Sequence, residues 1–205
     1  MPDASAGPDD EMILKFAVEL FRQLGITKPE PDTVVWDDGM SPDLVVVKLG
    51  EVRLPRSMRG RLTAEDWKPL LAPSIIYDYF LLRDPIRDYA LRVFLPLAIG
   101  FSLVGFDAIQ IIRSSQPEYV RELNLANLVI LLLYIPVIVL YVRRRWRSLF
   151  YAADRQAAEK VGRAVLLATL TKYGQTISAT GYPLKRLHLR PTVGQRIERL
   201  QKDLR

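Results

Sequence analysis

The chain has 205 residues, no cysteine, one histidine and a formal net charge of +6. The absence of cysteine excludes disulfides and cysteine-ligated zinc sites, and a single histidine cannot supply a pair of imidazole ligands. Charge is unevenly distributed, because residues 1–89, 90–142 and 143–205 carry formal charges of −5, 0 and +11. The middle segment is therefore predicted to differ in character from the two segments that flank it.

The first predicted element is an amphipathic helix over residues 9–24. Its apolar residues recur at helical spacing, Asp9 or Asp10 can cap its start, and Gly25 can end it. Three short runs rich in β-branched residues follow, and Gly50 predicts that the last two pair as an antiparallel hairpin. These runs are Thr33–Trp36, Leu44–Leu49 and Glu51–Leu54.

A second helix is predicted to begin after Thr63. Asp66 follows three residues later, which is the spacing of a capping box, and apolar residues then continue toward Phe80. Pro69 suits the first turn of such a helix, whereas Pro73 does not, because proline lacks the N–H that a helix interior needs.

Two apolar stretches come next, Ala90–Ile112 and Leu125–Val142, joined by a short polar connection. About 20 apolar residues are needed to cross the hydrocarbon core of a bilayer as a helix. The pattern therefore predicts a two-helix transmembrane hairpin. The alternative is a pair of buried core helices, which the basic cluster Arg143–Arg147 directly after the second stretch disfavours.

The basic residues predict the orientation of this hairpin. Arg83, Arg87 and Arg92 precede the first stretch, and the Arg143–Arg147 cluster follows the second. Lysine and arginine near a span are retained on the cytoplasmic side, so both termini are expected in the cytoplasm of a bacterial cell, with the protein integral to its plasma membrane. Because topology accounts for these arginines, we expect the lipid bilayer as a partner and no nucleic acid.

The C-terminal segment is predicted to contain two helices. Residues 149–173 are strongly helix-forming and are followed by Gly174, and Thr192 can cap a final helix. Residues 1–89 and 143–205 are each small for an independent core, so we expect them to pack together. The predicted fold class is α+β: a mainly helical cytoplasmic domain with a short antiparallel sheet, interrupted by the transmembrane hairpin at 90–142.

The order of these elements and one motif point to a known family. Ala153, Asp154 and Arg155, followed by Ala157 and Ala158, fit the pattern ADRxAA, which Arg196 and Ile197 support. With these residues the chain resembles the membrane gluzincin metallopeptidases, the family of the HtpX heat-shock protease and the CAAX prenyl endopeptidase. Active members carry HExxH on a helix, a third zinc ligand in an ExxxD motif, and a late HP…R motif that helps to hold substrate.

The resemblance implies that every metal-binding position is substituted. Aligned on LLAHE, this chain has LLAPS, which places Pro73 and Ser74 at the His-Glu pair and Tyr77 at the second histidine. Phe150 stands at the third-ligand glutamate, and Arg190 at the histidine of the late motif. HExxH requires two imidazoles on one helical face and a glutamate that activates the zinc-bound water, and none of these groups is present.

A second alignment register remains open. Anchored on Arg83 and Asp84, it places Ile75, Ile76 and Tyr79 at the motif instead. Neither register contains a zinc ligand pair, and the only histidine, His188, lies elsewhere. Asp154 and Arg196, which support the site in active relatives, are retained. The resemblance therefore implies an inactive pseudopeptidase without metal or cofactor.

We therefore expect a non-catalytic adaptor or accessory subunit that binds a membrane protein partner. The alternatives are a residual or partner-completed zinc metalloendopeptidase, and a structural subunit of a larger membrane complex. Its oligomeric state is left open. An edge strand can receive an extended segment, small residues let another helix approach, and a carboxylate in an apolar stretch marks a polar contact or reaches the headgroups. The candidate partner-binding residues are Leu44, Val46, Lys48, Gly100, Gly105 and Asp107.

Overall fold

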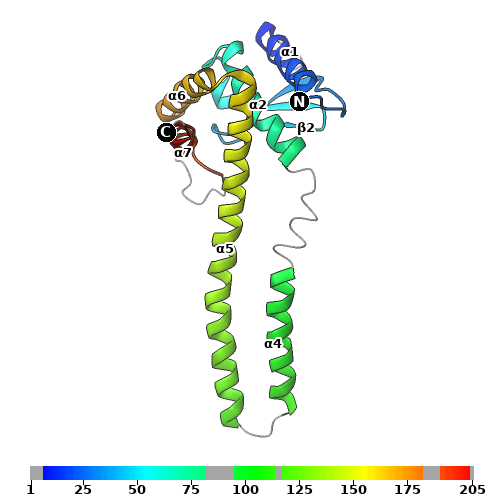
Figure 1. Ribbon diagram of the computed structural model, residues 1–205, viewed down its shortest axis with the longest axis vertical. Coiled ribbons are helices and arrows are strands. Elements are labelled where there is room, and N and C mark those ends of the chain that lie inside the picture. Colours follow the sequence, from blue (N-terminus) through cyan, green and yellow to red (C-terminus); the bar gives the residue numbers. More distant parts are fainter. Residues whose placement is uncertain (1–6, 82–94, 114–116, 182–189, 204–205) are drawn as a thin grey trace. The chain divides into compact units, whose positions relative to one another are not determined.

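A computed structural model describes residues 7–81, 95–113, 117–181 and 190–203 (Figure 1). The described residues fall into two compact units: the first combines those up to Arg83 with those from Arg147 onward, and the second covers Asp84–Trp146. The elements in chain order are α1 (Pro8–Gln23), β1 (Thr33–Asp37), β2 (Val46–Lys48), β3 (Glu51–Pro55), the 3₁₀ turn η1 (Arg56–Met58), α2 (Ala64–Ile76), the π-helical η2 (Tyr77–Leu81), α4 (Leu95–Arg113), α5 (Pro117–Val161), α6 (Arg163–Ala179) and α7 (Val193–Lys202).

Helix α1 confirms the amphipathic helix predicted for residues 9–24. Ile13, Ala17, Leu20 and Phe21 are almost completely buried and recur at helical spacing. The residue that caps the helix is Gly7, so the expected cap at Asp9 or Asp10 is wrong.

Asp10 instead connects the start of α1 to the sheet and to the turn after it. Its carboxylate accepts a hydrogen bond from the Gly7 N–H at 3.1 Å, from Nε1 of Trp36 at 2.8 Å and from Nη2 of Arg59 at 3.2 Å. A buried carboxylate with three donors is fully satisfied, so this contact serves the fold.

The three strands form a mixed sheet in the order β1-β3-β2. Strands β2 and β3 are antiparallel, which confirms the predicted hairpin, and Lys48 lies opposite Glu51. Strand β1 pairs in parallel with β3, with Thr33 opposite Glu51. The predicted antiparallel sheet must be corrected on this point, because a parallel pairing depends on how the chain returns between β1 and β2 and leaves no signal in the strand sequences.

Helix α2 lies at the centre of the first unit, where it contacts α1, β2, η2 and α6. Its predicted start after Thr63 is confirmed. Pro69 and Pro73 both lie inside the helix, so the expected place of Pro69 in the first turn is wrong, and Pro73 is accommodated in the helix interior. Beyond Ile76 the chain continues as the π-helical turn η2, and such turns occur often at functional sites.

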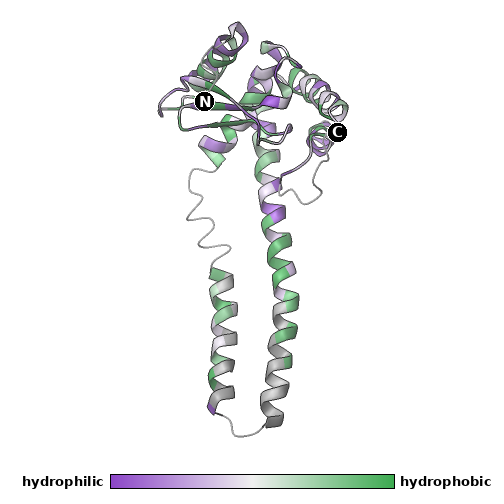
Figure 2. Ribbon diagram, turned by 180° about the vertical axis from the view of Figure 1, so that it is seen from behind, coloured by the Kyte–Doolittle hydropathy of each residue, from purple (hydrophilic) through white to green (hydrophobic). Residues whose placement is uncertain are grey.

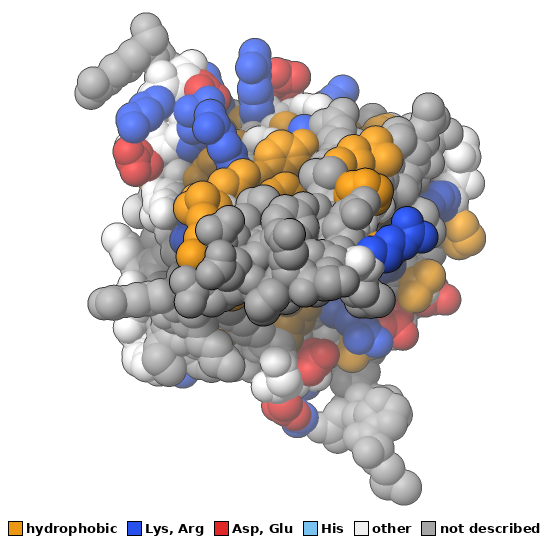
Figure 3. Space-filling model, turned by 90° about the horizontal axis from the view of Figure 1, so that it is seen from below, with side chains coloured by type: hydrophobic (Ala, Val, Ile, Leu, Met, Phe, Trp, Pro, Cys, Tyr) orange, Lys and Arg blue, Asp and Glu red, His pale blue; other side chains and the backbone are white. Residues whose placement is uncertain are grey.

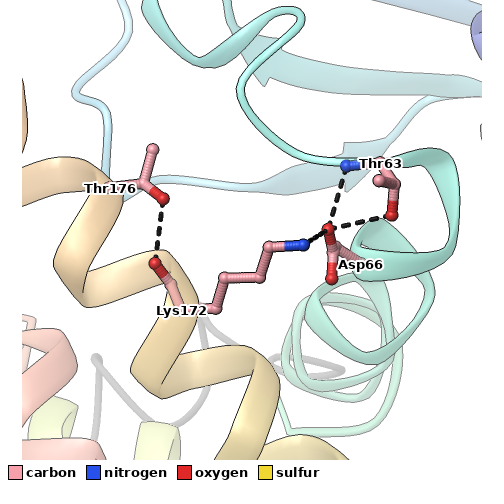
Figure 4. Close-up of polar contacts among 4 residues, drawn as sticks. All are labelled: Thr63, Asp66, Lys172 and Thr176. Carbon is pink, nitrogen blue, oxygen red and sulfur yellow. Dashed lines mark hydrogen bonds and ion pairs between the residues drawn. The ribbon is translucent and has the colours of Figure 1, made fainter.

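Asp66 joins the start of α2 to α6 (Figure 4). Its Oδ2 accepts hydrogen bonds from the N–H and the hydroxyl of Thr63, both at 2.9 Å, and lies 2.5 Å from Nζ of Lys172. Burial raises the pKa of Asp66, but the bonds from Lys172 and Thr63 outweigh it, so the pKa lies below its usual value. The Thr176 hydroxyl donates to the carbonyl of Lys172 one turn below.

The predicted helix over residues 149–173 is interrupted. Helix α5 ends at Val161 and α6 begins at Arg163, because Gly162 has a φ of 91°, a left-handed conformation that favours glycine. The predicted end at Gly174 is also wrong, since Gly174 lies inside α6. A Cβ there would lie 3.3 Å from Cγ1 of Val193, so this glycine lets α7 approach closely. The predicted cap of α7 at Thr192 is confirmed.

The second unit corrects the prediction of a transmembrane hairpin. Among the residues that the structure describes, no helix combines the length and the apolar character needed to cross a membrane. The first helix, α4, has 19 residues and includes Asp107 and Arg113, and residues 125–142 are the middle of a 45-residue helix rather than a helix of their own. The finding contradicts the α+β fold class with a transmembrane insertion and the expected integral location with cytoplasmic termini, and we do not retain them.

Large apolar side chains remain exposed on both helices of the second unit. Phe101 on α4 and Leu133 on α5 are 65% and 67% exposed, and Leu95, Phe106, Leu132 and Leu140 are similarly open. Both helices are apolar over much of their described length in Figure 2, and Figure 3 shows hydrophobic side chains exposed on the face that it draws. Exposed apolar surface of this extent is typical of an interaction surface.

Candidate functional site

A small cavity in the first unit is lined by most of the residues that the family alignment singles out. Its volume is about 40 Å³. Pro73 and Ser74 contribute from α2, Phe150 from α5 and Arg190 from the segment before α7, together with residues from the approach to β2, α6 and α7. Four of the positions that were compared with the family motif thus line one cavity, although some of them are distant in sequence.

The fifth position, Tyr77, lies against Phe150. The two rings are stacked, with centroids 4.1 Å apart and an interplanar angle of 13°. The guanidinium carbon of Arg190 lies 5.2 Å from the centroid of the Phe150 ring. Stacked rings and a cation over an aromatic face are favourable contacts, so these three side chains form an aromatic and cationic cluster.

The alternative alignment register leads to a different part of the molecule. Ile75 and Ile76 are at most 1% exposed and belong to the core. Tyr79 makes an edge-to-face contact with Phe21 of α1, with ring centroids 4.8 Å apart. Pro73 and Ser74 line the cavity and Tyr77 stacks on Phe150, whereas none of Ile75, Ile76 and Tyr79 lines the cavity.

Asp154 and Arg196, the two positions that the resemblance treats as retained, form a buried ion pair next to the cavity. Arg196 Nη2 lies 2.5 Å from Asp154 Oδ1, and Nε lies 2.9 Å from Oδ2. Asp154 is 1% exposed. Burial lowers the pKa of Arg196, but the Asp154 carboxylate outweighs this effect and raises it. The guanidinium therefore stays charged and links α7 to α5.

Ser74 does not act as a free hydroxyl. Its Oγ donates a hydrogen bond to the backbone carbonyl of Val45, just before β2. No histidine or lysine that could activate it lines the cavity within the described residues. Ser74 therefore connects α2 to the edge of the sheet.

Asp78 lies one helical turn beyond Ser74 and, like Ser74, interacts with the backbone at the edge of the sheet. Burial raises its pKa to about 6, against the opposing effects of Arg190, a hydrogen bond from the Val47 N–H, and Lys48. Asp78 in turn raises the pKa of Tyr79, after the larger effect of burial. A carboxylate held at a desolvation cost beside two cations is a candidate functional group.

The remaining predicted partner-binding residues fall into two groups. Leu44, Val46 and Lys48 lie along or just before the edge strand, and Lys48 is exposed. Gly100, Gly105 and Asp107 belong to α4 in the second unit. A Cβ on Gly100 would lie 2.9 Å from Cε1 of Tyr134, so Gly100 serves the packing of α4 against α5, whereas the space around Gly105 is open.

The donor set at the cavity does not fit a zinc ion. Proline, phenylalanine and arginine supply no ligand at Pro73, Phe150 and Arg190, and the Ser74 hydroxyl is bonded to Val45. A guanidinium in the cavity also repels a cation. No group of three His, Cys, Asp or Glu side chains with metal-binding spacing occurs among the described residues, and His188 lies outside them.

Sequence reasoning did not identify Asp78 or Tyr173. Tyr173 lines the cavity, and its hydroxyl donates to the carbonyl of Pro42 at 2.5 Å. Its burial raises its pKa. The spacing of Asp78 four residues after Ser74, on one helical face, is a signal that could have found it, whereas nothing near Tyr173 in the sequence indicates its partner.

Comparison of the chain with protein-family models, with curated proteins and with solved structures gives no match.

Proposed function

We propose that this chain is a non-catalytic protein-binding protein built on a scaffold of the gluzincin metallopeptidase type. The observation that carries the proposal is the convergence of the five substituted positions. Pro73, Ser74 and Arg190 line one cavity with Phe150, and Tyr77 stacks on the Phe150 ring. In active members of the family these positions hold the zinc ligands, the catalytic glutamate and the histidine of the late motif. Here their side chains pack against one another, which supports a scaffold of that type that has lost its metal site.

Binding is the function that remains for such a site. Strand β2 is at the edge of the sheet, and the residues leading into it line the cavity. The edge of a sheet presents backbone groups to which an extended segment of another protein can add as a further strand. We therefore place the binding region of the proposed adaptor along β2, beside the cavity.

The proposed scaffold is tested by introducing zinc ligands at the positions where active metallopeptidases of this type carry them. The combined variant Pro73→His, Ser74→Glu, Tyr77→His and Phe150→Glu is expected to bind zinc in a 1:1 ratio, measured by mass spectrometry of the metal after gel filtration with zinc sulfate. The matched control carries Ile75→His, Ile76→Glu, Tyr79→His and Phe150→Glu, which follow the other register. Equal zinc binding by both variants, or by neither, contradicts the scaffold.

The absence of catalysis is tested on the unmodified chain. It is expected to retain no stoichiometric zinc, to leave a fluorogenic peptide library intact, and to keep its melting temperature when a chelator is added. Stoichiometric zinc together with peptide hydrolysis would favour the metalloendopeptidase alternative, including the form completed by a second chain.

The binding region is tested by site-specific photo-crosslinking. A photoreactive residue placed at Lys48 on β2 is expected to give a crosslinked partner in cells, and the same residue at Thr33 on the opposite edge strand β1 serves as the matched exposed control. The same product from both positions would contradict a binding region at β2.

A further inference from the structure

The turn of the hairpin determines which backbone groups of β2 face outward. Leu49 and Gly50 have φ values of 56° and 84°, which is the conformation of a two-residue type I′ turn. In such a hairpin the pair next to the turn, Lys48 and Glu51, is hydrogen-bonded, and the next pair, Val47 and Val52, is not. The N–H and C=O of Val47 therefore point away from β3, and by the same alternation so do those of Val45.

Two side chains from one helical face already occupy this outer edge. The Ser74 hydroxyl donates to the C=O of Val45, and the Asp78 carboxylate accepts from the N–H of Val47. One supplies a donor and the other an acceptor, which is what the backbone of an added strand would supply. The edge of β2 is thus closed by contacts that imitate a neighbouring strand.

The charges around Asp78 indicate what could replace it. The positive charges of Lys48, at the exposed end of β2, and of Arg190, at the cavity, both lower the pKa of the Asp78 carboxyl group. If Asp78 moves away, both cations lose an acidic neighbour. An acidic side chain on the added segment would restore the charge balance, and complementary charge favours the correct partner and register.

We propose that the outer edge of β2 binds an extended acidic segment of a partner protein, which displaces the side chains of Ser74 and Asp78 from the strand. The segment donates a backbone N–H to the C=O of Val45 and offers a backbone C=O to the N–H of Val47. This inference rests on the proposed function and names the chemistry of its partner.

The test uses the full chain and short synthetic peptides of alternating valine and glutamate, with affinity measured by fluorescence anisotropy. A peptide with lysine in place of glutamate and a backbone-methylated glutamate peptide are the controls. Only the unmethylated acidic peptide is expected to bind. Equal binding of the lysine peptide overturns the acidic assignment, and equal binding of the methylated peptide overturns strand addition.

Variants then test the displacement. Ser74→Ala and Asp78→Ala each remove a contact that the peptide must replace, so each is expected to tighten binding by about tenfold. Lys48→Ala is expected to weaken it, whereas Arg22→Ala, which removes the same charge from an exposed site on α1, leaves it unchanged. Unchanged affinity in both Ser74→Ala and Asp78→Ala overturns the displacement while the proposed function stands.

A measurement on the chain without peptide tests the closed edge even if the alanine variants fold poorly. The backbone amide of Val47, followed by NMR between about pH 5 and pH 8, is expected to shift with the titration of Asp78, and the shift is expected to vanish in Asp78→Asn. A Val47 amide that does not respond to Asp78 overturns the closed edge. If no peptide binds to any variant, the partner assignment falls, whereas the zinc tests decide the scaffold independently.

Discussion

Arg196 and Asp154 form a bidentate ion pair between α7 and α5, with the two closest contacts at 2.5 and 2.9 Å. Arg196 also lines the cavity, and the Asp154 carboxylate is almost fully buried. Because a buried charge without its partner is unstable, the two residues depend on one another.

Removal of one partner should therefore be costly. Asp154→Ala is expected to lower the free energy of unfolding by about 3–5 kcal/mol, because it leaves the guanidinium buried and unpaired. Replacing both residues, as Asp154→Leu with Arg196→Met, should cost much less. Urea unfolding measures both values. Asp203→Ala is the control, since its exposed contact to Arg199 at 3.9 Å should contribute less than about 1 kcal/mol.

The stacking of Tyr77 on Phe150 should be measurable as a coupling energy. In a double-mutant cycle with Tyr77→Leu and Phe150→Leu, we expect the two substitutions to be non-additive by about 1 kcal/mol, the usual range for an aromatic pair. A matched cycle with Tyr77→Leu and Tyr151→Leu should be additive. A coupling of zero between Tyr77 and Phe150 would show that the rings only fill space.

Two glycines of α4 should respond differently to alanine. Gly105→Ala is expected to stabilise the helix by up to about 1 kcal/mol, because the space around it is open. Gly100→Ala should not be stabilised in this way, since its Cβ would lie 2.9 Å from Cε1 of Tyr134. Thermal unfolding followed by circular dichroism compares them. Equal stabilisation by both would contradict the packing of α4 on α5 at Gly100.

The raised pKa of Asp78 predicts how stability changes with pH. Folding raises this pKa from 3.8 to about 6, so the native state holds the proton more tightly than the unfolded state. The resulting stabilisation is complete below pH 3.8 and is lost as the pH rises through about 6. Asp78→Asn should therefore be more stable than the parent at neutral pH, by up to about 3 kcal/mol, and equally stable near pH 4. Urea unfolding at both pH values measures this difference, and one that grows toward acid would contradict it.

The parts of the fold that could be predicted from sequence are those with local signals. The capping residues Thr63 and Thr192 mark helix starts directly, and Gly50 marks the hairpin. The parallel pairing of β1 with β3 and the length of α5 could not be predicted, because they depend on contacts between distant segments. The apolar pattern of residues 125–142 carried no sign that the helix continues on both sides.

The candidate site likewise has parts that the sequence could predict and parts that it could not. The resemblance to a family motif singled out five positions, and four of them, Pro73, Ser74, Phe150 and Arg190, line one cavity. The role of Asp78 could not be predicted, because it depends on Lys48 and Arg190, which only the folded chain brings near it. A helical spacing of four from Ser74 places Asp78 on the correct face but does not reveal the strand beside it.

The first unit is closed by residues from opposite ends of the chain. The Tyr173 hydroxyl reaches the carbonyl of Pro42 across 131 residues, and the ring of Tyr173 packs edge-on against Trp67. During synthesis, residues 1–81 therefore leave the ribosome before the helices that cover them exist. Long-range closure of this kind slows folding and exposes apolar surface in the meantime. The first unit can therefore complete its packing only after α6 and α7 have been made.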